Sequence, residues 1–160
     1  MTRIAQLMTK KLITVDLMSS VEEAVSLLRQ RGVRHLLVMH KAEMVGIISD
    51  RDINRALNPS RTKKRVMAIG GLYFLLEPIL VEEIMTADPR TVSPSTSVHE
   101  ATRLMLEHHF GALPVVRNGQ PVGIVTESDL LRYYDAQQQK TETVRHRPEK
   151  RLPRKKRASS

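Results

Sequence analysis

Apolar and polar positions follow one order in the first half of the chain. Residues 11–15 form a short run rich in β-branched and aliphatic side chains, which is typical of a strand. Val21, Ala24, Val25 and Leu28 then recur at the spacing i, i+3, i+4, i+7 of one helical face. The pattern therefore predicts a short strand followed by an amphipathic helix.

Two apolar runs and a further helix follow in the same half. The runs are His35–Met39 and Met44–Ile48, parted by a polar turn, and the second helix starts near Ser49. Leu7–Thr9 and its later equivalent Ile84–Thr86 are expected as short turns that introduce each first strand. The unit reads strand, helix, strand, strand, helix.

The second half repeats this order at a constant offset of 77 residues, without a gap. Ser20–Ala24 returns as Ser97–Ala101, and Val45–Asp52 returns as Val122–Asp129. A fixed offset over about fifty positions indicates an internal repeat rather than chance similarity. We expect two copies of one structural unit, related by an approximate two-fold axis.

The two copies are joined by a connector with a different composition. We expect copy one at residues 4–57, the connector at 58–80 and copy two at 81–136. The front of the connector is basic, whereas residues 67–76 are apolar and are expected to form a helix packed on the body.

Composition narrows the class of protein. The 160 residues are 41% hydrophobic but only 3% aromatic, so we expect one ordinary core built from aliphatic side chains. The sequence has no cysteine, which excludes disulfides, thiolate metal sites and thiol nucleophiles and fits a reducing compartment. No signal-peptide pattern opens the chain, and the uncharged stretch 66–76 is far shorter than the roughly 20 residues of a membrane span. We therefore expect a cytoplasmic protein without membrane contact.

The net charge of +9 is concentrated at one end. Residues 140–157 hold nine Lys or Arg against two Glu. With few apolar residues, residues 140–160 are expected to form a disordered basic tail. Such a tail can bind nucleic acid nonspecifically through phosphates, or serve only as a solvated, solubilising segment. Both interpretations stay open.

The ordered motifs of the two copies resemble a known family. Leu113–Val116, Val122–Thr126 and Asp129 match the pattern of the CBS (cystathionine-β-synthase type) domain. In copy one, Leu37 stands where the family usually has Pro, and Ser49 replaces Thr. The resemblance implies an α/β (α+β) fold of two βαββα units in a tandem pair, or Bateman module, with two clefts between the repeats.

The strongest candidate site residues lie where a strand passes into a helix. Ser49 and Thr126 are expected as N-caps, beside backbone N–H groups that attract anions. Asp52 and Asp129 follow three residues later, and a carboxylate can accept hydrogen bonds from both hydroxyls of a ribose. The resemblance implies this nucleotide-binding role for both pairs. The simpler interpretation is that each pair only caps its helix.

Weaker candidates come from the resemblance alone. It implies that an adenine lies near the first strand of each copy, where Thr14 and Thr91 are candidate nucleotide-binding residues.

The copies also differ at informative positions. Arg34 and His35 of copy one correspond to Gly111–Ala112, and Arg51 corresponds to Ser128. Basic residues just before this strand often reach phosphates in the family. Copy one is therefore expected to favour a more highly phosphorylated ligand, unless these cations are only solvated surface charges.

Catalytic patterns are absent from the sequence. His108 and His109 are adjacent and lie on different helical faces, and no phosphate-binding glycine loop occurs. We expect a non-enzymatic regulatory module that binds an adenine nucleotide, such as AMP, ADP, ATP or NAD, and signals to a partner protein. The resemblance also implies a homodimer. A purely structural pair with empty clefts is the remaining alternative.

Overall fold

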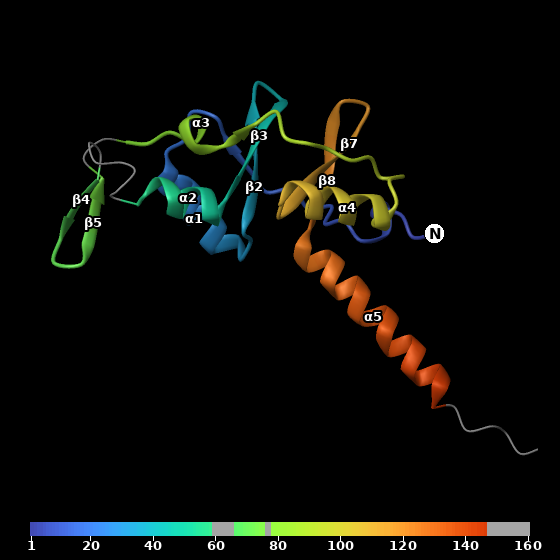
Figure 1. Ribbon diagram of the computed structural model, residues 1–160. Helices are drawn as coiled ribbons and strands as arrows, with labels where there is room; N and C mark the ends of the chain where they lie inside the picture. Colours follow the sequence, from blue (N-terminus) through green and yellow to red (C-terminus); the bar gives the residue numbers. More distant parts are fainter. Residues whose placement is uncertain (59–65, 76–77, 147–160) are drawn as a thin grey trace, which may run out of the picture.

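The computed structural model describes residues 1–58, 66–75 and 78–146. Copy one contains the five elements that its pattern predicts (Figure 1). They are β1 (Thr14–Asp16), α1 (Val21–Arg31), β2 (His35–His40), β3 (Glu43–Ser49) and α2 (Asp50–Ala56). Strand β1 is parallel to β2, and β2 and β3 form an antiparallel hairpin.

Copy two repeats this arrangement with one reduction. It contains α4 (Val98–His108), the antiparallel hairpin of β7 (Ala112–Arg117) and β8 (Gln120–Thr126), and α5 (Glu127–Arg145). Its first strand is reduced to a single parallel bridge between Val92 and Val115. The predicted α+β class with two repeats is confirmed.

The first segments of the two copies are exchanged between them. At the start of copy one, the 3₁₀-helix η1 (Ile4–Gln6) buries Ile4 completely in the core of copy two. At the start of copy two, the short helix α3 (Val81–Ile84) buries Val81 completely in the core of copy one. Each copy therefore completes its core with the first residues of the other copy.

Backbone pairing follows the same exchange. Strand β6 (Thr86–Ala87) extends the sheet of copy one in the order β1-β2-β3-β6, where Thr86 pairs with Ile47. Thr9 forms the equivalent bridge to Ile124 of copy two, with N···O distances of 2.9 and 3.0 Å. The sequence predicts only short turns here, and the structure shows that these turns also join the two halves.

The predicted helix in the connector is wrong. The segment forms a hairpin of β4 (Val66–Ile69) and β5 (Leu72–Leu75), which projects from one end of the molecule (Figure 1). Gly70 and Gly71 turn the chain with φ of +57° and +80°. A two-residue turn with positive φ at both positions favours glycine, and two adjacent glycines weaken a helix by about 2 kcal/mol.

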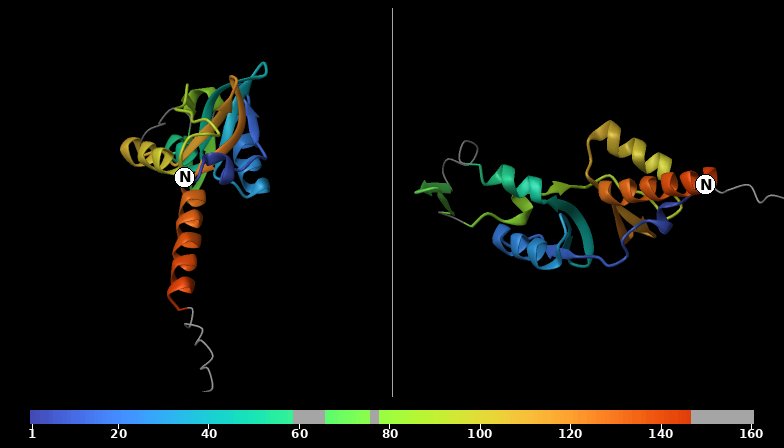
Figure 2. Two further views of the ribbon diagram at one scale, coloured as in Figure 1. Left: turned by 90° about the vertical axis from the view of Figure 1, so that its right-hand side faces the viewer. Right: turned by 90° about the horizontal axis from the view of Figure 1, so that it is seen from below.

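The predicted start of the disordered tail, at residue 140, is too early. Helix α5 continues to Arg145, so residues 140–145 are helical rather than disordered, and residues 147–160 lie outside the described part. A helix already capped at Thr126 extends at little cost per residue, which explains the continuation. Figure 2 shows α5 leaving the body as a rod. None of the helices in the described ranges is both long and apolar enough to cross a membrane.

Candidate functional site

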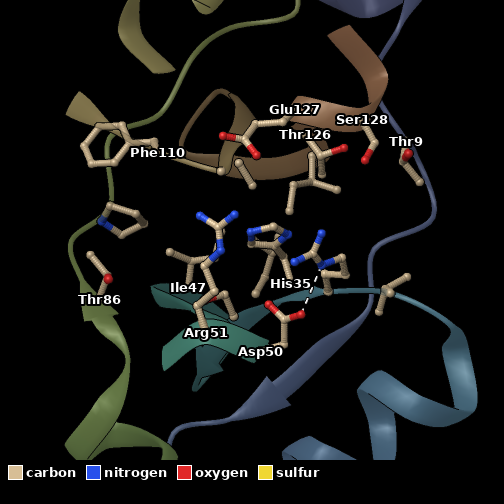
Figure 3. A pocket seen from close by; sticks show the side chains of 18 of the residues that line it. Thr9, His35, Ile47, Asp50, Arg51, Thr86, Phe110, Thr126, Glu127 and Ser128 are labelled. Atoms are coloured by element: carbon tan, nitrogen blue, oxygen red, sulfur yellow. Dashed lines mark hydrogen bonds and ion pairs between the residues drawn. The ribbon is translucent and has the colours of Figure 1, made fainter. Parts of the chain in front are cut away.

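A cleft of about 500 Å³ lies between the two copies (Figure 3). Seven of the nine predicted site residues line it, namely Arg34, His35, Ser49, Arg51, Asp52, Thr126 and Asp129. Thr14 and Thr91 are exposed and are not among the lining residues. Both helix junctions therefore face one continuous cleft, where the family resemblance implied two.

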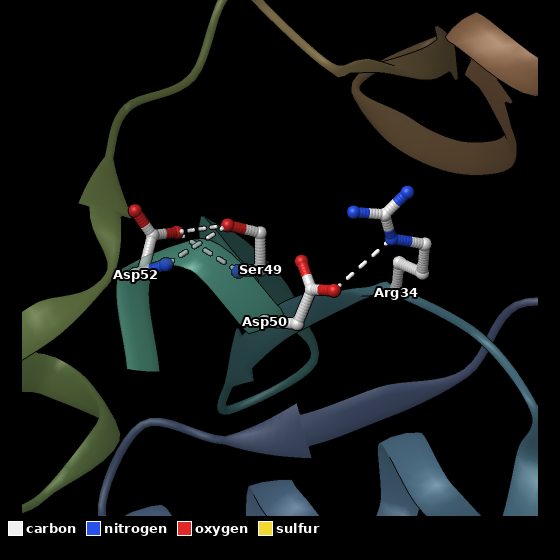
Figure 4. Close-up of polar contacts among 4 residues, drawn as sticks. All are labelled: Arg34, Ser49, Asp50 and Asp52. Carbon is white, nitrogen blue, oxygen red and sulfur yellow. Dashed lines mark hydrogen bonds and ion pairs between the residues drawn. The ribbon is translucent and has the colours of Figure 1, made fainter. Parts of the chain in front are cut away.

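The Ser49 junction forms a reciprocal cap at the start of α2 (Figure 4). Ser49 donates to Asp52 Oδ2 from its backbone N at 2.8 Å and from its hydroxyl at 2.9 Å. Asp52 Oδ1 accepts no hydrogen bond within the described residues, and its nearest cation is Arg55 Nη1 at 4.0 Å. The capping interpretation is thus correct for Oδ2, while Oδ1 stays available to a ligand.

The Thr126 junction has the same cap but a different second oxygen. Thr126 donates to Asp129 Oδ2 from its backbone N at 2.9 Å and from its hydroxyl at 3.1 Å. Asp129 Oδ1 accepts a hydrogen bond from Arg132 Nη2 at 2.7 Å. The side chain of Asp129 is 7% exposed against 19% for Asp52, so copy two presents less free carboxylate to the cleft.

Most backbone donors at these junctions are already used. Asp50 N donates to the Arg34 carbonyl, and Glu127 N donates to the Gly111 carbonyl, both at 3.0 Å. Asp52 N binds the Ser49 hydroxyl at 3.2 Å. The anion attraction expected from free N–H groups is therefore reduced, and side chains must supply most of the contacts to a phosphate.

Arg34 is less available than the sequence implies. Its Nε donates to Asp50 Oδ2 at 3.0 Å, which forms an ion pair at the mouth of copy one. Arg51 also lines the cleft, and its guanidinium forms no hydrogen bond or ion pair with any described residue. Figure 3 shows Arg51 and His35 between the two copies, with Glu127 on the opposite side.

His35 lies against the second copy. A β-carbon placed on Gly111 would come 3.2 Å from His35 Nε2. Burial lowers the pKa of the His35 imidazole below 6.5, the nearby Asp50 carboxylate opposes that shift, and Arg34 adds to it. The pKa is raised to a smaller extent by Asp52 and Glu127. The neutral form of His35 therefore predominates at pH 7, and its ring nitrogens have no hydrogen-bond partner in the described structure.

Several cleft residues escape the sequence analysis. Phe110 supplies an aromatic ring to the lining and stacks on His108 with a centroid distance of 5.2 Å. Glu127, Arg55 and Arg132 also line the cleft. The 77-residue offset could have identified Arg55 and Arg132, because they occupy equivalent positions one helical turn after Asp52 and Asp129.

Metal ligation has no support in the described ranges. No group of three or more His, Asp or Glu side chains there is arranged to hold an ion.

The chain belongs to the CBS domain family. The family matches it twice, at residues 4–59 and 81–136. A CBS domain-containing protein of Dictyostelium discoideum is 32% identical over 134 residues, which is 80% of this chain and 88% of that protein. Inosine-5'-monophosphate dehydrogenase of Korarchaeum cryptofilum is 35% identical over 123 residues, 76% of this chain. The match spans only 22% of that dehydrogenase.

Solved structures agree with the family assignment. A putative signal-transduction protein with CBS domains from Burkholderia ambifaria superposes with a TM-score of 0.72 at 30% identity, over 86% of this chain and 96% of the other. CBSX2 in complex with AMP gives 0.67 at 31%, over 85% and 98%. The CBS domain pair of MJ0100 in complex with 5'-methylthioadenosine and S-adenosyl-L-methionine gives 0.70 at 26%, over 85% and 98%.

Proposed function

We propose that this chain is a non-catalytic regulatory module that binds an adenine nucleotide in the cleft between its two CBS repeats. The observation that carries the proposal is the Asp52 carboxylate. One oxygen is fixed by Ser49, and the other, in the cleft, has no hydrogen-bond partner among the described residues. A carboxylate held in this way is the acceptor that the 2′- and 3′-hydroxyls of a ribose require.

The cleft suits a ligand of this size and polarity. Its volume of about 500 Å³ lies within the range of ordinary small-molecule sites. Leu12, Ile13, Leu37 and Ile47 give part of the lining an apolar surface for a base. Arg51 places an unpaired cation in the same cleft for a phosphate.

Ligands of similar proteins support the adenosine class. CBSX2 binds AMP, and the MJ0100 pair binds 5'-methylthioadenosine and S-adenosyl-L-methionine. Adenosine is the part that these ligands share. AMP, ADP, ATP and NAD are therefore the first compounds to test on this chain.

Regulation requires that the ligand binds one state of a complex more tightly than another. The receiver of the signal is then a second protein chain, and a homodimer is part of the proposal. Leu106 of α4 and Leu131 and Tyr134 of α5 are 70, 68 and 63% exposed, on two helices that contact one another. Exposed apolar side chains of this kind are the ones that a second copy of the chain would cover in a dimer.

Isothermal titration calorimetry with AMP, ADP, ATP, NAD and S-adenosylmethionine tests the proposal. At least one should bind, and Asp52→Asn should weaken it at least tenfold. Asp135→Asn on the exposed part of α5 is the matched control and should change nothing. If no compound gives heat or raises the unfolding temperature, the chain is better interpreted as a structural pair with an empty cleft.

Nucleic-acid binding by the basic tail stays a separate prediction, because residues 147–160 lie outside the described part. A truncation after His146 retains α5 and removes seven of the nine basic residues of 140–157, so it tests the charged tail alone. A salt-dependent gel shift that disappears on this truncation would support nucleic-acid binding. A chain that gives no shift at low salt would exclude it.

A further inference from the structure

Five pairs of equivalent positions from the two helix junctions line the cleft, and two of these pairs differ in charge. In copy one they are Arg34, Asp50, Arg51, Asp52 and Arg55. In copy two they are Gly111, Glu127, Ser128, Asp129 and Arg132. Copy one thus has three cations and two carboxylates, and copy two has one cation and the same number of carboxylates. Over these five positions the net charge therefore changes sign, while Lys11, Asp88 and Arg90 add charges elsewhere in the lining.

The first carboxylate of each junction shows the same contrast. In copy one, Asp50 is neutralised by Arg34 at 3.0 Å. In copy two, the position of Arg34 is taken by Gly111, which has no side chain to pair with Glu127. Glu127 forms no ion pair or side-chain hydrogen bond with the described residues. Its carboxylate therefore lines the cleft without a direct partner among the described residues.

His35 of copy one lies close to Glu127 but does not neutralise it. A β-carbon on Gly111 would lie 3.2 Å from His35 Nε2 and 4.0 Å from Glu127 Oε2, so the two side chains flank the same point. Because burial lowers the pKa of His35 below 6.5, the ring is mostly neutral at pH 7 and adds little positive charge there.

The next position adds to the difference. Arg51 of copy one is an unpaired cation in the cleft, whereas its equivalent Ser128 carries no charge. A phosphate at copy one meets the Arg51 guanidinium, and a phosphate at copy two meets the Glu127 carboxylate. Arg51 and Glu127 are both exposed, so the contrast between the two junctions should be strongest at low salt.

We propose that Glu127 is a specificity-determining residue that excludes phosphorylated ligands from the copy-two junction. The chain then binds one phosphorylated adenosine ligand, at the copy-one junction. This inference rests on the proposed function, because it presupposes that the cleft binds adenosine compounds.

Calorimetric titration with AMP and with adenosine, at pH 7.5 and low salt, tests the assignment. The wild-type chain should bind one AMP. Glu127→Gln should add a second AMP site or strengthen a weak one at least tenfold, and Glu127→Gln combined with Ser128→Arg should strengthen it further. Adenosine carries no phosphate, so its affinity should change less than twofold in either variant.

Asp50→Asn is the matched control, because it removes the equivalent carboxylate from copy one. It should tighten AMP binding at copy one by releasing Arg34, without adding a site. Circular dichroism should show that Glu127→Gln folds normally, since Glu127 is exposed and supports no other side chain.

Three results would overturn the assignment while leaving the proposed function intact. They are two equal AMP sites in the wild-type chain, no change in AMP binding on Glu127→Gln, and an equal gain for adenosine and AMP. If neither AMP nor adenosine binds the wild-type chain, the proposed function itself is refuted for these ligands and the role of Glu127 with it.

Discussion

The sulfur of Met85 occupies the space beside Gly46 in which any other residue would carry its β-carbon. A β-carbon on Gly46 would lie 2.6 Å from Met85 Sδ and 2.9 Å from the Thr86 carbonyl oxygen. Gly123 has the same relation to Met8 and to the Thr9 carbonyl, at 2.8 and 3.0 Å. Each glycine thus lets the first segment of the other copy reach the strand on which the glycine lies.

Gly46→Ala should lower the free energy of unfolding by about 1–3 kcal/mol, the usual range for overpacking. The flexible Met85 side chain can move aside, but the Thr86 carbonyl belongs to a paired strand and cannot. Urea denaturation measures the change. Met85→Ala should not relieve the conflict with the backbone, so the double variant Gly46→Ala with Met85→Ala should be no more stable than Gly46→Ala alone. If Gly46→Ala has the same free energy of unfolding as the wild-type chain, this packing is contradicted.

Removal of residues 2–8 should expose the core of copy two rather than that of copy one. The deletion takes away the fully buried Ile4 and the Thr2 carbonyl that accepts from Val98 N at 3.1 Å. Hydrogen exchange should therefore accelerate in β7 and β8 much more than in β2 and β3. Faster exchange confined to copy one would show that the segments are not exchanged.

Local patterns predicted most of the fold. Helices α1 and α4 lie on the predicted apolar faces and begin at the N-caps Ser20 and Ser97, and both hairpins follow their apolar runs. The exchange could not be predicted, because a short turn such as 7–9 carries no signal for the sheet that it joins. The helix predicted for the connector is wrong because an apolar run of ten residues fits a helix as well as a hairpin. The adjacent glycines decide between the two.

The candidate site was predictable where it depends on spacing along the chain. Ser49 and Asp52 are three residues apart, so their contact follows from helix geometry. Arg34 and Asp50 are sixteen residues apart, and only the β2–β3 hairpin brings them together. The opposition of His35 and Glu127 depends on how the copies meet, which no local pattern records.

Stability should depend on pH through His35. Its pKa is lower in the folded chain than the ordinary 6.5, so the fold favours the neutral ring. This contribution is complete above pH 6.5 and is lost as the pH falls through the folded pKa, because the unfolded chain binds the proton first. Urea denaturation from pH 8 to pH 5 should show a larger loss for wild type than for His35→Gln. Parallel curves would exclude this role.

Arg132→Ala should improve adenosine binding at copy two by releasing Asp129 Oδ1. The gain should not exceed about fivefold, because an ion pair to a cation as exposed as Arg132 contributes at most about 1 kcal/mol. Arg55→Ala is the equivalent change in copy one, where the N···O distance is already 4.0 Å, and it should have no such effect. Calorimetry with adenosine compares the two, and an equal gain in Arg55→Ala would contradict the role given to Arg132.

The exchanged segments give the chain the architecture of a domain-swapped dimer whose two subunits have been fused end to end. In a swapped dimer each subunit lends an arm to its neighbour, and here η1 and α3 are the arms. Fusion frees the two halves from the identity that a symmetric dimer imposes on its subunits. A difference such as Glu127 in copy two, at the position equivalent to Asp50 of copy one, can then arise in one half alone. The reciprocal arms still hold both junctions at the same cleft.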